Sequence, residues 1–354
     1  MSRWIYGIDE LSKEEYALVG KKCANLGELA RAGFRVPRGF ALAVTAYEKF
    51  FYNTGIVEEI KRLCQKFNAD PDNPADVTKF KDLSMVIRKI IEDKEFPDDM
   101  GDAIVKKYED MCPLGSEYVL PVAVRSAGPA SHPGQYETYL FVSGKSDVLE
   151  NIKKVWSSTF NGRSMVARSR LGIPLHYDPI GVAVIGMVKA KAAGVMFTAN
   201  PVNGDLSKIM IEASLGLGES VVSGSVDPDR YMIDKVTFEI IESKVSTKLV
   251  QYAVDRENGK PRFFDIPKEK QNIPSLNEEE MLEIARIGKK IEKHFGSPQD
   301  IEWAVDMDLP FPENIFLLQT RNANIKEEKI AEQVFETGKT ALDLIQDIAR
   351  LGKL

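Results

Sequence analysis

Two uninterrupted apolar runs constrain the fold of this chain more than any other feature of its sequence. The segments IGVAVIGMV (180–188) and AAGVMFTANP (192–201) contain no charged residue. Strands of this composition are usually covered by protein on both faces. Polar and apolar residues alternate over 229–255, and this pattern predicts an antiparallel meander. The sequence therefore combines fully buried strands with an antiparallel portion.

Helical patterns occupy much of the remaining sequence. Apolar residues recur at helical spacing from Asn277 until Gly296, and a charge-rich region of helical pattern covers residues 54–110. Trp156 and Phe160 lie one turn apart in a further helical pattern, so we expect both in the core. Helices mixed with antiparallel strands indicate an α+β fold.

The length of 354 residues suggests two domains or one large bilobed unit. We expect an N-terminal lobe with a helical insertion over residues 1–200 and a C-terminal lobe over 201–325. Residues 326–354 have apolar residues at helical spacing on a charged background, which predicts a helical tail. The pattern fits packing on its own domain and packing on a partner equally well.

Composition excludes several classes of function. The formal net charge of −6 argues against nucleic-acid binding, which needs a basic surface. No apolar run is long enough to cross a bilayer, and the N-terminus lacks the apolar core of a signal peptide, so we expect a cytoplasmic protein. Cys23, Cys64 and Cys112 form no CxxC pair, which argues against a disulfide framework or a cysteine metal cluster.

Two segments carry cations in positions that suit phosphate binding. In GKKCANLGEL (20–29) the lysines lie just before a helix start, where free N–H groups and the helix dipole favour anions. In VAVRSAGPASHPGQYETYL (122–140), Arg125 follows apolar strand residues and leads into a loop of small residues. The simpler interpretations are solvated surface lysines and an ordinary hairpin loop with a surface arginine.

A third segment carries carboxylates at strand spacing. Asp300 and Glu302 in QDIEWAVD lie two residues apart, so they point to the same face of a strand. Gln319 and Arg321 repeat this spacing in NIFLLQTR, which the turn DLPFPEN joins to the first strand. Such a set can form the floor of a Mg·nucleotide site. A solvent-facing polar stripe is the competing interpretation.

Taken in order, these segments resemble the N-terminal nucleotide-binding domain of the phosphoenolpyruvate synthase and pyruvate phosphate dikinase family. The resemblance covers residues 18–322 and implies an ATP-grasp fold of two α+β lobes, with ATP and Mg²⁺ bound between them. The matching segments are GKKCANLGEL, VPRGFALAVTAY, VRSAGPASHPGQYET, GVMFTANPV, IEASLGLGESVVSG, DPDRYMIDK, DIEWAVD and LLQTRN.

The resemblance also implies roles for individual residues. Phosphate and nucleotide contacts are expected from Lys22, Arg125, Gly134, Thr138 and Glu212. Catalysis and Mg²⁺ binding are expected from Asp300 and Glu302, with Gln319 as a further metal ligand and Arg321 near metal and phosphates. The family's roles make Lys22, Arg125, Asp300, Glu302 and Gln319 the catalytic set.

Two positions depart from the family pattern. Ile185 stands where the family usually has a glutamine beside the adenine, which leaves nucleotide preference open. His132 falls inside the arginine loop, and we expect it to be at most a donor to phosphate and not the phosphocarrier.

The family mechanism needs a phosphorylatable histidine, and none of the three histidines lies in a glycine-rich threonine–histidine motif. We therefore expect the histidine on a partner subunit, in a hetero-oligomer. This arrangement resembles phenylphosphate synthase, which converts phenol, ATP and water to phenylphosphate, AMP and phosphate. The alternatives are a phosphoenolpyruvate synthase-like ATP-binding domain acting on pyruvate, a non-catalytic nucleotide-binding regulatory module, and an ATP-grasp ligase that makes an acyl-phosphate.

Overall fold

The computed structural model describes residues 3–112, 119–128, 136–255 and 259–324. It divides into two compact units. Unit 1 comprises Met1–Lys189, Val254–Arg262 and Phe316–Gln319, and unit 2 comprises Ala190–Ala253, Phe263–Ile315 and Thr320–Leu354. The predicted helical tail over 326–354 lies outside the described residues.

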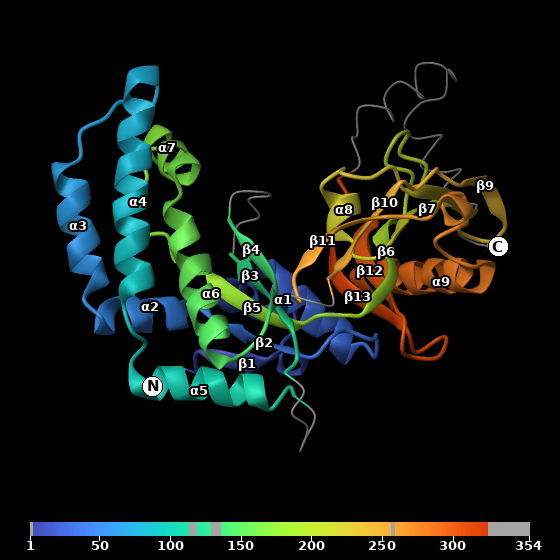
Figure 1. The fold of residues 1–354 in the computed structure, drawn as a ribbon, viewed down its shortest axis with the longest axis horizontal. Coiled ribbons are helices and arrows are strands. Elements are labelled where there is room, and N and C mark those ends of the chain that lie inside the picture. The colour runs from blue at the N-terminus through green and yellow to red at the C-terminus, as the bar shows by residue number, and fades with distance from the viewer. Residues whose placement is uncertain (1–2, 113–118, 129–135, 256–258, 325–354) are drawn as a thin grey trace, which may run out of the picture. The chain divides into compact units, whose positions relative to one another are not determined.

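Unit 1 is built on a five-stranded sheet with the order β1-β2-β5-β3-β4 (Figure 1). Neighbouring strands in this sheet are antiparallel. Its strands are β1 (Ile5–Gly7), β2 (Gly39–Leu42), β3 (Val122–Ala127), β4 (Thr138–Val142) and β5 (Gly181–Gly186). All six residues of β5 are buried, as its apolar composition predicts.

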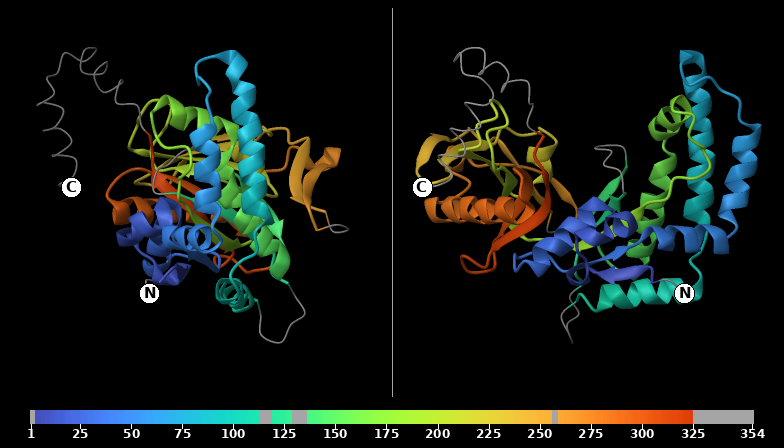
Figure 2. Two further views of the ribbon diagram at one scale, coloured as in Figure 1. Left: turned by 90° about the vertical axis from the view of Figure 1, so that its left-hand side faces the viewer. Right: turned by 180° about the vertical axis from the view of Figure 1, so that it is seen from behind.

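Helices surround this sheet. They are α1 (Tyr16–Arg31), α2 (Val44–Asn53), α3 (Ile56–Lys66), α4 (Val77–Asp93), α5 (Asp98–Glu109), α6 (Lys145–Ser157) and α7 (Gly162–Arg170). The views in Figures 1 and 2 agree that α3, α4 and α7 form one group beside the sheet. Helices α3, α4 and α5 lie in the charge-rich region that is predicted to be helical over 54–110.

The core of unit 1 lies between one face of the sheet and the helices. Val122 and Val124 of β3 point into it, and they meet aromatic side chains from α2 and α6. Phe50 of α2 packs against Trp156 of α6, with ring centroids 5.2 Å apart. Trp156 and Phe160 are fully buried, so the expectation that both lie in the core is confirmed.

Unit 2 contains a six-stranded sheet with the order β13-β12-β6-β7-β8-β9. The strands are β6 (Ala190–Phe197), β7 (Lys208–Leu215), β8 (Asp229–Asp234), β9 (Ile240–Lys244), β12 (Gln299–Asp306) and β13 (Ile315–Asn322). The short helix α8 (Glu219–Val222) follows β7, and α9 (Glu278–Phe295) packs on the sheet. Four residues of β13, Phe316–Gln319, are counted with unit 1.

The helix α9 begins and ends where the sequence predicts. The side chain of Asn277 accepts a hydrogen bond from the backbone N–H of Glu280 at 2.8 Å, and the carboxylate of Glu280 accepts one from the backbone N–H of Asn277 at 3.2 Å. Gly296 ends the helix with a φ of 74°. Gly288, in the middle of the helix, lies against Met196 of the sheet.

Two features differ from the sequence-based expectations. The first continuous segment of unit 1 ends at Lys189 rather than at residue 200, because β6 pairs with β7 and β12 and so belongs to the second sheet. β10 (Val250–Val254) does not continue the meander of β8 and β9 but pairs with β11 (Pro261–Asp265) in a separate two-stranded sheet. The alternating pattern of β10 specifies a strand and cannot specify its partner.

The α+β class is confirmed by these two sheets and their helices. No described helix is both long and apolar enough to span a bilayer.

Candidate functional site

The lysine segment and the arginine strand come together in unit 1. Gly20 interrupts the regular geometry of α1 with φ 75° and ψ 159°, a conformation open essentially only to glycine. A Cβ at this position would lie 2.6 Å from the backbone of Ala127 and of Gly128. The absence of a side chain therefore lets the lysine segment approach the end of β3, two residues beyond Arg125.

Arg125 lies on the face of β3 opposite the apolar core. Its partner on β4 is Thr138, and its partner on β5 is Ala183. Directly opposed residues of antiparallel strands point to the same face. The guanidinium and the Thr138 hydroxyl thus share a face with small side chains such as Ala183 and Ala123, which leave room beside the cation.

Lys22 and Arg125 are neighbours of the same buried thiol. Burial raises the pKa of Cys23 to about 12, while Lys22 and Arg125 act in the opposite direction through their positive charge. Lys22 is exposed and Arg125 is half-buried. This part of unit 1 therefore gathers two cations and a hydroxyl, a set that suits the oxygens of a polyphosphate.

Ile185 lies on the same face of this sheet as Arg125. It is directly opposite Ala123 on β3 and Gly39 on β2. Its side chain is 8% exposed. An isoleucine offers no hydrogen bond here, in contrast to the glutamine usual in the family.

Asp300 and Arg321 form an ion pair in unit 2. The guanidinium of Arg321 donates to Oδ2 of Asp300 from Nε at 2.8 Å and from the terminal nitrogen at 2.7 Å. Burial raises the pKa of Asp300, and the negative charge of Glu302 acts in the same direction, while Arg321 lowers it. The two carboxylates therefore interact electrostatically, as expected for residues on one face of a strand.

Glu212 belongs to a row of residues that crosses the second sheet. The register places Glu302 opposite Val195, Val195 opposite Glu212, and Glu212 opposite Arg230. Arg230 donates to one oxygen of Glu212 from Nε at 3.0 Å and from the terminal nitrogen at 2.7 Å. The backbones of β6 and β7 approach each other closely beside this row, because a Cβ at Gly194 would lie 1.8 Å from the carbonyl oxygen of Glu212.

Sequence reasoning did not identify Arg230 as part of this site. The residue lies in the segment DPDRYMIDK, but its pairing with Glu212 depends on a cross-strand register that the local sequence does not specify. The alternation of DRYMID on β8 was the only available signal, since it puts Arg230 and Met232 on one face.

The predicted magnesium ligands offer oxygen donors of the right kind. The carboxylates of Asp300 and Glu302 and the amide oxygen of Gln319 are hard ligands, which Mg²⁺ prefers. Gln319 is a buried residue, with 7% of its surface exposed. Described residues contain no group of three or more His, Cys, Asp or Glu arranged for a metal. Within unit 2, Asp300 and Glu302 lie on the same strand, and their carboxylates are the kind of donor that would hold a magnesium ion together with waters and nucleotide oxygens.

Two predicted positions cannot be placed. Gly134 and His132 lie in the segment 129–135, outside the described residues. Thr138, just beyond this segment, is described and is placed beside Arg125 as stated above.

Comparison with known proteins adds to this geometry. The family described as pyruvate phosphate dikinase, AMP/ATP-binding domain, matches residues 16–341. A probable phosphoenolpyruvate synthase of Staphylothermus marinus is 38% identical, over 97% of this chain and 44% of its own length. A phosphoenolpyruvate synthase of Aeropyrum pernix is 36% identical, over 93% of this chain and 43% of its own. The chain thus spans less than half the length of these relatives.

Among solved structures, D-alanyl-alanine synthetase A of Vibrio cholerae is 12% identical over 76% of this chain and 64% of its own, with a TM-score of 0.28. D-alanine–D-alanine ligase of Helicobacter pylori is 10% identical over 69% of this chain and 54% of its own, with a TM-score of 0.25. These scores are too low to support an argument about the site.

Proposed function

Because this chain belongs to the family of the pyruvate phosphate dikinase AMP/ATP-binding domain, we propose that it binds Mg·ATP and passes phosphate to a histidine outside its 354 residues. In this proposal it is the ATP-binding part of a dikinase-type phosphotransferase of ATP-grasp fold. The observation that carries the proposal is the grouping of Lys22, Arg125 and Thr138 at the end of β3.

The described residues suit particular steps of this reaction. Arg125 offers a planar fork of donors, and Lys22 a mobile point charge, to neutralise the phosphates. Asp300 and Glu302 would hold Mg²⁺, which would withdraw charge from the phosphate oxygens during transfer. Gln319 would supply a further metal ligand, while Arg321 keeps Asp300 oriented through their ion pair.

The phosphate acceptor is proposed to be a histidine on a partner subunit, so that the active assembly is a hetero-oligomer. His176 precedes β5, and His294 lies in the last turn of α9. Neither is in a glycine-rich loop that would present an imidazole for transfer. A histidine elsewhere would receive the pyrophosphoryl group of ATP, which leaves AMP. Water would then release inorganic phosphate from it, and the remaining phosphoryl group would pass from the histidine to the final acceptor.

Pyruvate is the preferred final acceptor in this proposal. Relatives at 36–38% identity are named phosphoenolpyruvate synthase. Phenol, the acceptor in phenylphosphate synthase, has no support from these names. A reconstituted assay that compares pyruvate with phenol separates the two acceptors.

The first test is nucleotide binding by the isolated chain. Mg·ATP should bind, and Arg125→Met should weaken binding at least about tenfold, because charge-assisted hydrogen bonds contribute about 1.5–3 kcal/mol each. Arg170→Met is the matched control, since Arg170 pairs with the exposed carboxylate of Asp72 on another part of unit 1. Equal affinities for wild type and Arg125→Met would contradict the proposed phosphate site.

The second test follows phosphate transfer. ATP labelled at the β or γ phosphate is incubated with this chain and a histidine-bearing partner, and phosphohistidine is then located. Label should appear on the partner and not on His176 or His294. Unchanged transfer by Glu302→Gln would instead favour a regulatory nucleotide-binding module.

A further inference from the structure

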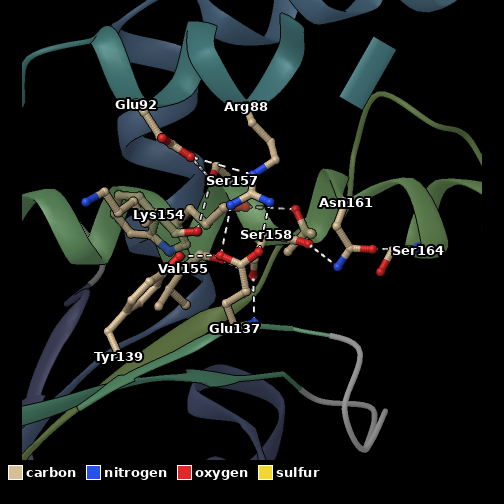
Figure 3. Close-up of polar contacts among 12 residues, drawn as sticks. Arg88, Glu92, Glu137, Tyr139, Lys154, Val155, Ser157, Ser158, Asn161 and Ser164 are labelled. Carbon is tan, nitrogen blue, oxygen red and sulfur yellow. Dashed lines mark hydrogen bonds and ion pairs between the residues drawn. The ribbon is translucent and has the colours of Figure 1, made fainter. Parts of the chain in front are cut away.

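An ion pair holds Glu137, the residue next to Thr138. Glu137 directly precedes β4, and Arg88 of α4 grips both of its carboxylate oxygens (Figure 3). The two distances, from the terminal nitrogens of Arg88 to Oε1 and Oε2 of Glu137, are both 2.8 Å. The hydroxyl of Tyr139 also donates to Oε2. Such a bidentate pair fixes direction as well as distance.

The backbone of Glu137 is anchored too. Its N–H donates to Oγ of Ser158 at 3.2 Å. Ser158 is fully buried, and its hydroxyl donates in turn to the carbonyl of Val155 in α6 at 2.7 Å. Glu137 is thus tied to α4 by its side chain and to the end of α6 by its backbone.

The two helices that hold Glu137 are joined to each other. Oγ of Ser157 donates to Oε1 of Glu92 on α4 (Figure 3). Nζ of Lys153 on α6 donates to the carbonyl oxygens of Glu92 and Lys94, at 2.5 Å and 2.9 Å. These contacts cap the C-terminal end of α4 and join it to α6, so the elements that carry Arg88 and Ser158 are fixed to each other.

Strand pairing alone holds this part of β4 weakly. In the part of the chain that the structure describes, β4 is the edge strand of its sheet and its neighbour is β3. The register shifts between Val122 and Val124, so the pairing of Arg125 with Thr138 follows an irregularity. A shifted edge strand needs further contacts to fix its side chains.

We propose that Arg88 and Glu137 are positioning residues that keep Thr138 opposite Arg125 for binding of the ATP phosphates. The inference rests on the proposed function, because it assigns the phosphates to Arg125 and Thr138. The side chains of Arg88 and Glu137 are 28% and 36% exposed, so the pair contributes little to the free energy of unfolding. Its effect is on the orientation of β4.

The test compares ATP with adenosine. Arg88→Met should weaken binding of Mg·ATP about five- to tenfold, in the range of coupling between neighbouring groups. Binding of adenosine, measured by competition, should not change, because adenosine lacks the phosphates. Glu137→Gln is the second variant, which keeps size and weakens the ion pair. Arg170→Met is again the control and should leave both ligands unaffected.

A double-variant cycle then tests whether Arg88 acts through Thr138. In a Thr138→Val background, Arg88→Met should cause little further loss of ATP affinity. Full additivity of the two losses, or parallel losses of ATP and adenosine, would overturn the inference, since either indicates a general structural role. Unchanged ATP affinity in both Arg88→Met and Glu137→Gln would overturn it as well. Failure of the wild-type chain to bind ATP at all would instead refute the proposed function.

Discussion

A buried ion pair in unit 2 allows a stability prediction that is independent of function. Asp229 begins β8, and Lys248 lies between β9 and β10; both side chains are fully buried. Nζ of Lys248 donates to Oδ1 of Asp229 at 2.6 Å and to the carbonyl of Ser246 at 3.0 Å. Oδ1 also accepts from the N–H of Ser246 at 2.9 Å. Oδ2 accepts from the N–H and hydroxyl of Ser275 at 2.7 Å and 2.8 Å.

These contacts set the expected magnitudes. Lys248→Met removes the cation but leaves the Asp229 carboxylate with hydrogen-bond donors from Ser246, Ser275 and Tyr231, so we expect a loss of about 3 kcal/mol, the lower end for breaking a buried pair. Asp229→Asn leaves a buried ammonium and puts an amide NH₂ against backbone N–H groups, so we expect about 4–5 kcal/mol. Either loss is a large share of the 5–15 kcal/mol that is typical of a folded protein.

Urea unfolding followed by far-ultraviolet circular dichroism measures this effect. With a slope of about 2 kcal/mol per molar urea, Lys248→Met should lower the midpoint of unfolding by about 1.5 M. Hydrogen exchange of the β8 amides localises the loss to unit 2. Lys208→Met is the matched control, because Lys208 pairs with Asp234 in the same unit at the surface.

The combined variant gives the clearest check. Asp229→Asn together with Lys248→Met should cost less than the sum of the single changes, because no unpaired charge is left buried. The reasoning is refuted if Lys248→Met and Lys208→Met shift the midpoint equally. It is also refuted if the two buried changes are additive.

Three further changes test other parts of the molecule. Gly20→Ala should lower the free energy of unfolding by about 2–4 kcal/mol and weaken ATP binding, since it combines a forbidden backbone conformation with overlap on β3; unfolding and ATP titrations that match wild type would contradict this. Cys23, whose pKa is raised to about 12 by burial, should resist thiol reagents at pH 8 until the protein unfolds, and rapid labelling of the native protein at Cys23, located by peptide mapping, would count against it. The pKa of Asp300 is raised above 3.8 in the folded state, so its ionisation weakens the fold as pH rises through that pKa. Asp300→Asn should therefore gain stability relative to wild type at pH 7 but not near pH 3, and a difference in unfolding free energy that is the same at both pH values would refute the assignment.

The sequence predicts which segments form helices and strands better than it predicts which strands pair with each other. The apolar run 180–188 specifies a fully buried strand, and β5 is one. Helical spacing, an Asn277 cap and Gly296 define α9 almost to the residue. The alternation in β10, however, predicts a continued meander, and the structure pairs β10 with β11 instead. Hydrophobic period is a local property, while strand pairing depends on distant residues.

The same distinction applies to the candidate site. Asp300 and Arg321 could be placed near each other, because both lie on strands joined by a short turn. The sequence could not place Arg230 beside Glu212 or Arg88 beside Glu137, since both contacts depend on long-range packing. The separations of 18 and 49 residues in these pairs carry no local signal. Nothing in the sequence around Arg88 distinguishes it from the other charged residues of α4.

The alternation along β3 makes correct folding a condition for the phosphate site. Val122 and Val124 fill the aromatic core, while Ala123 and Arg125 point the other way. A slip of one residue would exchange the two faces and drive a guanidinium into hydrocarbon. Misregistered chains would then be unstable rather than merely inactive. Selection for a well-packed core therefore also preserves the direction of the Arg125 side chain, without acting on Arg125 itself.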